Sequence, residues 1–137
     1  MTTSQKGEIA QLKVQLRAAE KGLTSSRPTV DDCRYDLILD DGQKLWRVQI
    51  KYAAGSSSHS DGCVSVGLRR WNGRDNTNTR TYTRRDCDSL LVYVQPVDKI
   101  ACLAPALFAE KTCVNIRYAP AKNAQVKNVI MLDSVLW

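Results

Sequence analysis

Residues 34–51 decide the fold, and they read RYDLILDDGQKLWRVQIK. Residues 35–39 and 45–52 are rich in branched and aromatic side chains, and Asp40-Asp41-Gly42 lies between them. Such segments on either side of a turn sequence predict two antiparallel strands joined as a β-hairpin.

The hairpin sets the direction of three polar side chains. Side chains alternate faces along a strand, so Gln49 and Lys51 share one face. Asp36 joins that face if the loop has two residues, which places it opposite Arg47, or four residues, which places it opposite Gln49. A three-residue loop would turn Asp36 to the other face, because a slip of one residue reverses every side chain.

A carboxylate, an amide oxygen and an ammonium group on one face suit metal-assisted hydrolysis. Mg²⁺ binds a few protein oxygens and retains water, so Asp36, Gln49 and the Ile50 carbonyl are candidate ligands. Lys51 would orient or deprotonate the attacking water and counter charge on a phosphate. From the residues alone, a structural salt bridge explains the same pattern equally well.

The rest of the chain predicts one α/β domain, residues 1–137, with a mixed central sheet flanked by helices. Apolar residues at 9, 12, 16 and 19 predict an amphipathic helix over 4–21 that ends at Gly22, and 25–32 is expected to be a loop. The further expected elements are strands at 63–68, 89–94, 99–103 and 114–118 and a short helix at 105–111. The 89–94 segment is continuously apolar, as a buried central strand would be. The apolar tail 126–137 requires burial, part of it against a partner subunit.

Positive charge is concentrated in residues 69–85, which hold six arginines against one aspartate in a chain of net charge +6. Such a patch attracts polyanions by releasing counterions, so we expect a basic insertion that binds double-stranded DNA; a solvated basic loop is the alternative. A ribbon or long loop here would enter the major groove, where arginine reads guanine and asparagine reads adenine. The candidate DNA-binding residues are Arg69, Arg70, Asn72, Arg74, Asn76, Asn78, Arg80, Tyr82, Arg84 and Arg85, with Ser57 and His59 from the loop after the hairpin. For Tyr82, core packing is the alternative.

Five scattered cysteines without a CxxC pair predict reduced thiols and a cytoplasmic protein. A zinc site is not expected, because His59 is the only histidine. No apolar run is long enough to span a bilayer, so no membrane association is expected.

Three blocks of sequence resemble one nuclease family: Lys6-Gly7 at the start of the helix, the run RYDLILDDGQKLWRVQIKYA, and LLVYVQPVDKIACLAP further on. Together they are similar to PD-(D/E)XK nucleases, and most closely to group I intron-associated homing endonucleases of cyanobacterial type, over about residues 5–118. The resemblance implies a restriction-endonuclease-like core. It also implies site-specific cleavage of double-stranded DNA with Mg²⁺ or another divalent cation.

By this resemblance, Asp36 is the metal-binding carboxylate and Lys51 the catalytic lysine. Gln49 stands at the acidic (D/E) position and offers an oxygen without charge. The relatives begin K-G-x-x-x-E, so Gln11 stands where a glutamate reaches the metal site, whether by nature or by an introduced Glu-to-Gln change. We therefore expect catalysis to involve Gln11 and to be attenuated.

One site per chain must cut two strands, so we expect self-association as a dimer or tetramer. A nuclease resembling Holliday junction resolvases or repair nucleases is one alternative function. A non-catalytic DNA-binding module with a decayed nuclease site is another.

Overall fold

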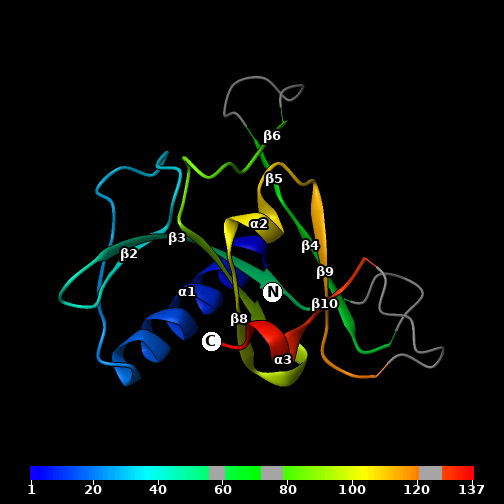
Figure 1. Cartoon of the computed structure of the whole chain (residues 1–137). Helices are drawn as coiled ribbons and strands as arrows, with labels where there is room; N and C mark the ends of the chain where they lie inside the picture. The colour runs from blue at the N-terminus through cyan, green and yellow to red at the C-terminus, as the bar shows by residue number, and fades with distance from the viewer. Residues whose placement is uncertain (56–60, 72–78, 121–127) are drawn as a thin grey trace.

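The computed structural model describes residues 1–55, 61–71, 79–120 and 128–137, leaving aside the side chains of residues 70, 71 and 79. Its largest sheet has the strand order β1 (Thr24–Ser26), β2 (Leu37–Asp40), β3 (Leu45–Ala53), β7 (Ser89–Val94) and β8 (Lys99–Leu103). The β3–β7 pair is parallel and the other pairs are antiparallel (Figure 1). The predicted mixed sheet is confirmed, with 89–94 at its centre.

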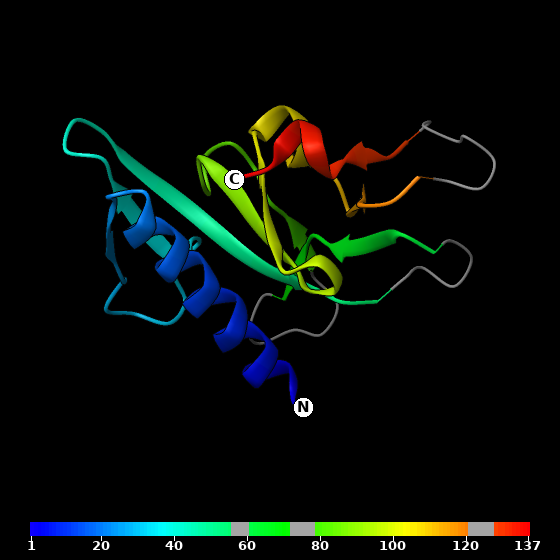
Figure 2. The same ribbon diagram turned by 90° about the horizontal axis from the view of Figure 1, so that it is seen from below.

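A second layer covers one face of this sheet. It consists of β4 (Cys63–Gly67), β9 (Cys113–Arg117) and β10 (Ile130–Met131), with the short helices α2 (Pro105–Phe108) and α3 (Leu132–Val135) (Figure 2). Leu90 and Val92 of β7 are fully buried in this core beside Phe108 of α2. The tail enters this layer through Leu132, which is 4% exposed.

Helix α1 (Thr3–Glu20) covers the opposite face with a different stripe from the one the sequence indicated. Ala10, Val14 and Ala18 are fully buried, whereas Leu12 and Leu16 are 55% and 59% exposed. The large side chains in this layer come from β2, β3 and β7, so the small residues of the helix let it lie close to the sheet. The expected helix is confirmed, but the 12 and 16 positions face outward.

The ends of α1 follow from local hydrogen bonds. Thr2 and Gln5 form a reciprocal capping box at its start. At its end Gly22 has φ +76°, and the amides of Gly22 and Leu23 donate to the carbonyls of Ala19 and Ala18. This is a Schellman motif, which confirms the stop predicted at Gly22.

Thr24–Ser26 corrects the prediction that residues 25–32 are wholly loop, because this segment pairs with β2 as an edge strand. Only its central residue is half-buried, so its few contacts come mainly from backbone pairing. A three-residue edge strand of Ser and Thr leaves no apolar alternation for a sequence pattern to detect.

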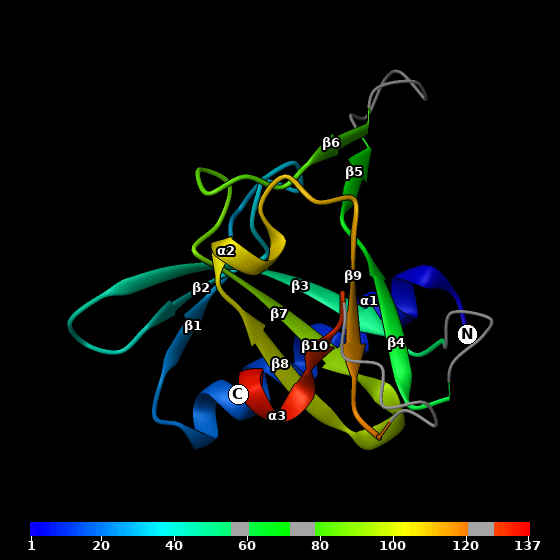
Figure 3. The ribbon, with the colours of Figure 1, turned by 45° about the vertical axis from the view of Figure 1, so that its right-hand side comes forward.

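The basic segment forms a separate two-stranded ribbon of β5 (Arg69–Trp71) and β6 (Thr79–Thr81). The strands are antiparallel, with Arg70 opposite Arg80, and the ribbon stands away from the main sheet (Figure 3). A 3₁₀ turn, η1 (Gln95–Val97), joins β7 to β8. Of the two predicted forms of the basic insertion, a ribbon or a long loop, the paired strands form a ribbon.

The buried stripe of α1 predicts unequal effects of two truncations. Val14→Ala should lower the free energy of unfolding by about 2 kcal/mol, because it removes two methyl groups from a closed core. Leu12→Ala, from an exposed position, should change it by less than about 0.5 kcal/mol. Urea unfolding of both variants measures this, and a larger loss for Leu12→Ala would contradict the assigned face.

Candidate functional site

The hairpin register brings Asp36 to the face of Gln49 and Lys51. Asp40 pairs with Leu45 and Leu37 with Val48, so the loop has four residues, and Asp36 lies just before the last pair with its side chain at Gln49. Two carboxylates bind the backbone amides of this loop. Asp40 accepts from the Gly42 amide, and Asp41 accepts from the amides of residues 43 and 44. These bonds hold the pKa of Asp41 below its usual value. The four-residue alternative is therefore confirmed.

This face is the one turned away from α1. Gln49 pairs with Leu90 and Lys51 with Val92 in the parallel β3–β7 ladder, and both partners lie in the core beneath the second layer. Val48 and Ile50 point the other way, into the core under α1.

The Asp36 carboxylate is fixed at the point where β2 begins. Its Oδ2 accepts from the Ile50 amide at 2.8 Å and from the Gln49 Nε2 at 2.7 Å. The Asp36 amide donates to the Val48 carbonyl at 2.9 Å. Asp36 is thus held by both its backbone and its side chain against β3.

The Gln49 carboxamide lies between two oxygens. Its Nε2 is 2.7 Å from Asp36 Oδ2 and 3.5 Å from the Ile50 carbonyl oxygen, and the residue is only 9% exposed. Exchange of the amide's nitrogen and oxygen would turn Oε1 toward the same place. Three oxygens of the kind that Mg²⁺ prefers then face one another, but only Asp36 carries a formal negative charge.

Lys51 lies above an aromatic ring. Its Nζ is 5.1 Å from the centroid of the Tyr82 ring, within the range of a cation–π contact. Tyr82 is 3% exposed and packs in the core, so we assign it to the support of Lys51 and correct its expected contact with DNA. An inward-facing ring at the foot of the ribbon has no accessible face on which a sugar could pack.

Two ion pairs that the sequence reasoning missed border the site. Arg47 Nε and Nη2 reach the Asp88 carboxylate at 3.3 and 3.1 Å, and the Arg47 amide donates to it at 2.8 Å. Arg34 donates to Asp86 at 2.9 Å. The sequence signal was Asp-Cys-Asp at 86–88, where two acids precede the largely apolar strand 89–94.

The pKa values of these acids reflect their partners. Hydrogen bonding from Arg47 lowers the pKa of Asp88. Burial opposes ionisation of Asp86, but the Thr83 amide and Arg34 outweigh it, so its pKa is also lowered. Burial raises the pKa of the intervening Cys87 to about 11, so this thiol stays neutral as part of the core. The five cysteines form no disulfide.

Gln11 lies on α1, which packs against the opposite face of the sheet from Gln49 and Lys51. With the nitrogen and oxygen of its amide exchanged, the Gln11 carboxamide oxygen accepts from the Arg27 guanidinium. Arg27 also lies 3.7 Å from a carboxylate oxygen of Glu8. In this structure the Gln11 side chain is therefore engaged at the surface of the helix.

Four arginines of the basic insertion are available to an outside partner. Arg69, Arg80, Arg84 and Arg85 are exposed, and their side chains make no hydrogen bond or ion pair with another described residue. The other DNA-binding candidates, namely the Arg70 side chain and Ser57, His59, Asn72, Arg74, Asn76 and Asn78, lie outside what the structure describes.

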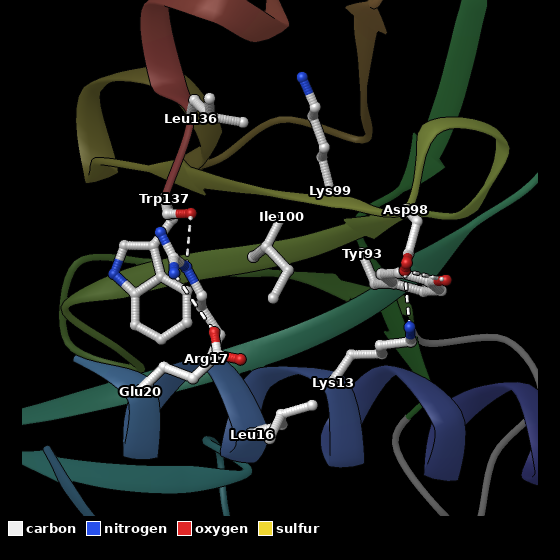
Figure 4. A pocket seen from close by; sticks show the side chains of 10 residues that line it. All are labelled: Lys13, Leu16, Arg17, Glu20, Tyr93, Asp98, Lys99, Ile100, Leu136 and Trp137. Carbon is white, nitrogen blue, oxygen red and sulfur yellow. Dashed lines mark hydrogen bonds and ion pairs between the residues drawn. The ribbon is translucent and has the colours of Figure 1, made fainter. Parts of the chain in front are cut away.

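A cavity of about 360 Å³ lies away from this site, between α1 and the end of the chain (Figure 4). Lys13, Tyr93 and Asp98 form a hydrogen-bonded group at one end, and Trp137 lies at the other. None of the three site residues lines it. Within the described part of the chain, no three His, Cys, Asp or Glu side chains gather as a metal cluster.

Comparison with known proteins identifies the family of this chain. The family model of PD-(D/E)XK endonucleases matches residues 1–134. The chain belongs to the PD-(D/E)XK endonuclease family. A solved bacterial homing endonuclease, I-Ssp6803I, is similar to this family member, with a TM-score of 0.77 and 27% identity over 93% of this chain and 84% of that chain. None of the curated proteins matches.

Family membership confirms the predicted restriction-endonuclease-like fold, and it supports nuclease function and a DNA substrate. PD-(D/E)XK nucleases generally use divalent metals. Within the described residues no helix has the length and apolar character needed to cross a membrane.

The Arg47–Asp88 pair predicts a pH dependence of stability. Because the pKa of Asp88 is lower in the folded protein than in the unfolded chain, its stabilisation is present above the unfolded value and is lost as pH falls through the folded one. Asp88→Asn should lower the free energy of unfolding by about 1 kcal/mol at neutral pH, and the difference from the parent should shrink below about pH 4. Urea unfolding across this range measures both. Asp31→Asn, at an exposed position, is the control, and a constant difference for Asp88→Asn would contradict the assignment.

Proposed function

We propose that this chain is a site-specific, divalent-metal-dependent endonuclease that hydrolyses both strands of DNA, as a homing endonuclease does. The observation that carries the proposal is the convergence of Asp36 Oδ2, the Ile50 carbonyl and the Gln49 carboxamide beside Lys51 on one face of β3. Membership of a nuclease family and similarity to a bacterial homing endonuclease support it.

The donor set fits a hard divalent cation such as Mg²⁺. Asp36, the Ile50 carbonyl and the Gln49 amide oxygen would hold it, with DNA phosphate oxygens and water as further ligands. When bound, the cation supplies polarisation of a phosphoryl oxygen and a more acidic water. With one carboxylate in the set, we expect metal binding to be weak until DNA contributes its phosphate.

Lys51 is placed to act on the phosphate itself. Lys51 is a half-buried residue whose Nζ rests over the buried Tyr82 ring, so the ring directs the ammonium group. A cation at this position offsets negative charge that builds on the scissile phosphate, and its Nζ can exchange a proton with the attacking water.

The basic ribbon supports DNA as the substrate. Arg69 and Arg80 lie on its two strands and are exposed, and neither guanidinium makes a hydrogen bond or ion pair with another residue that the structure describes. A two-stranded ribbon fits the major groove, where it would read bases. Cleavage of both strands by chains with one site each requires self-association, which we propose as a dimer or tetramer.

Lys51→Met should abolish most cleavage without preventing DNA binding. The change keeps the length of the side chain but removes the charge, so cleavage should fall about 100-fold or more. The matched control is Lys44→Met, which removes a lysine stacked over Trp46 at the far end of the same hairpin. Cleavage is measured on a randomised duplex library with Mg²⁺ or Mn²⁺, by sequencing the cut ends. Equal loss in both variants would sink the assigned role.

Gln11→Glu tests whether the chain is attenuated. A glutamate there would add a second carboxylate if α1 moves when DNA and metal bind, so Mg²⁺-dependent cleavage should rise about tenfold or more. Gln15→Glu, one turn along the same helix, controls for added charge alone. Equal rates for the parent and Gln11→Glu would show that Gln11 stays with Arg27 and is not part of the site.

The same assays separate the two rival functions. Cleavage confined to branched DNA would replace a homing function with a junction-resolving one. DNA binding without metal binding or cleavage, even in Gln11→Glu, would identify a non-catalytic module.

A further inference from the structure

Residues 82–88, which we call the clasp segment, connect the basic ribbon to the central strand. The segment begins immediately after β6, the second strand of the ribbon, and ends immediately before β7 (Figure 3). A displacement of the ribbon would therefore shift this segment directly. The contacts of the segment with the residues of the hairpin decide whether the shift reaches the site.

The clasp segment contacts Lys51 directly, and it contacts an arginine near each of the other two site residues. The Tyr82 ring lies under Lys51. Asp86 binds Arg34, two residues before Asp36, and this carboxylate is 9% exposed and also accepts from the Thr83 amide at 2.8 Å.

Asp88 makes the corresponding contact with β3. It binds Arg47, two residues before Gln49 and on the same face of the strand. The bonds are reciprocal, because the Asp88 amide donates to the Arg47 carbonyl at 2.8 Å while the Arg47 amide donates to the Asp88 carboxylate. They lie one position before Val48 and Ser89, the first pair of the parallel β3–β7 ladder. Together they fix where β3 starts against β7.

The Arg47 guanidinium contacts the clasp segment through all of its nitrogens. Two of its guanidinium nitrogens reach Asp88, and the third donates to the Arg85 carbonyl at 2.7 Å. All three nitrogens are thus directed at the clasp segment. These contacts suit Arg47 to a positioning role, because they tie β3 to the clasp segment.

The clasp segment itself carries cations that face outward. Arg84 and Arg85 are exposed, and the Arg85 carbonyl is the acceptor for Arg47. A phosphate bound by the Arg85 guanidinium would thus act on the same residue whose backbone holds Arg47. The side chain that could bind phosphate and the carbonyl that holds Arg47 thus belong to the same residue.

We propose that the clasp segment couples engagement of DNA by the basic ribbon to the geometry of Asp36, Gln49 and Lys51, with Arg47 and Asp88 as positioning residues. The inference rests on the proposed nuclease function. It adds that the cleavage face is set by DNA contacts made elsewhere on the chain, through paired side chains that touch neither metal nor phosphate.

The test uses two resonances at the site. In ¹⁵N-labelled full-length protein, the Ile50 amide and the Gln49 carboxamide report the two hydrogen bonds to Asp36. A mixed-sequence DNA duplex added without divalent metal should shift both resonances in the parent. In Asp88→Asn the duplex should bind with a similar Kd, but the DNA-induced shifts should be largely lost.

Asp98→Asn is the matched control. It breaks an ion pair with Lys13 of comparable length, 2.7 Å, that is distant in sequence from the ribbon (Figure 4). The DNA-induced shifts should survive in this variant. If Asp88→Asn does not fold, Arg47→Lys replaces it, because that change keeps the charge and loses the forked contact.

Cleavage rates give the second readout. With saturating DNA, Asp88→Asn should slow single-turnover cleavage about 10- to 100-fold, as loss of a supporting contact does, while Asp98→Asn should not. Unchanged DNA-induced shifts in Asp88→Asn, or no shifts in the parent, would overturn the coupling. If the parent and Gln11→Glu fail to cleave any duplex, the proposed function fails, and the resonances alone then decide the coupling.

Discussion

The hydrogen bond from the Ile50 amide to Asp36 Oδ2 is the contact on which this site depends. Strand β2 begins at Leu37, while β3 continues to Ala53, so the backbone of β3 loses its partner on that side at Ile50. The Asp36 carboxylate takes over as acceptor there. A buried amide without an acceptor is unfavourable, so the end of the ladder itself holds the carboxylate at β3. The position of Gln49, and hence of every proposed metal ligand, follows from this bond.

Strand parity could be predicted from residues 34–51, because Asp-Asp-Gly leaves only a few hairpin loops and two of them give the same face. The central strand 89–94 was equally clear, since the apolar residues that follow Ser89 in a row need cover on both faces. The buried stripe of α1 was not predictable from periodicity. The leucines follow helical spacing as well as Val14 and its two alanines do, and only the bulk already supplied by the sheet selects the small residues.

The residues that support the site could not be predicted from the sequence either. The sequence analysis assigned no partner to Arg34 or Arg47, because their partners Asp86 and Asp88 lie 52 and 41 residues away. Tyr82 read as a candidate DNA contact because it follows a basic run, although its ring is turned inward. In each case the pairing depends on the return of the chain from the ribbon to β7, which is a property of topology rather than of any local pattern.

Stability alone does not account for these pairs. The Arg47 and Asp88 side chains are 37% and 31% exposed, and ion pairs of this exposure contribute little to folding. Asp86 is 9% exposed, but even a buried pair is often replaceable by apolar residues without loss. What the forked contact of Arg47 with Asp88 gives instead is direction, since two bonds fix an orientation that a single charge leaves free. Both pairs on the clasp segment lie two residues before a proposed ligand of the metal. Geometry at the cleavage face, rather than free energy of folding, is the quantity that they are placed to control.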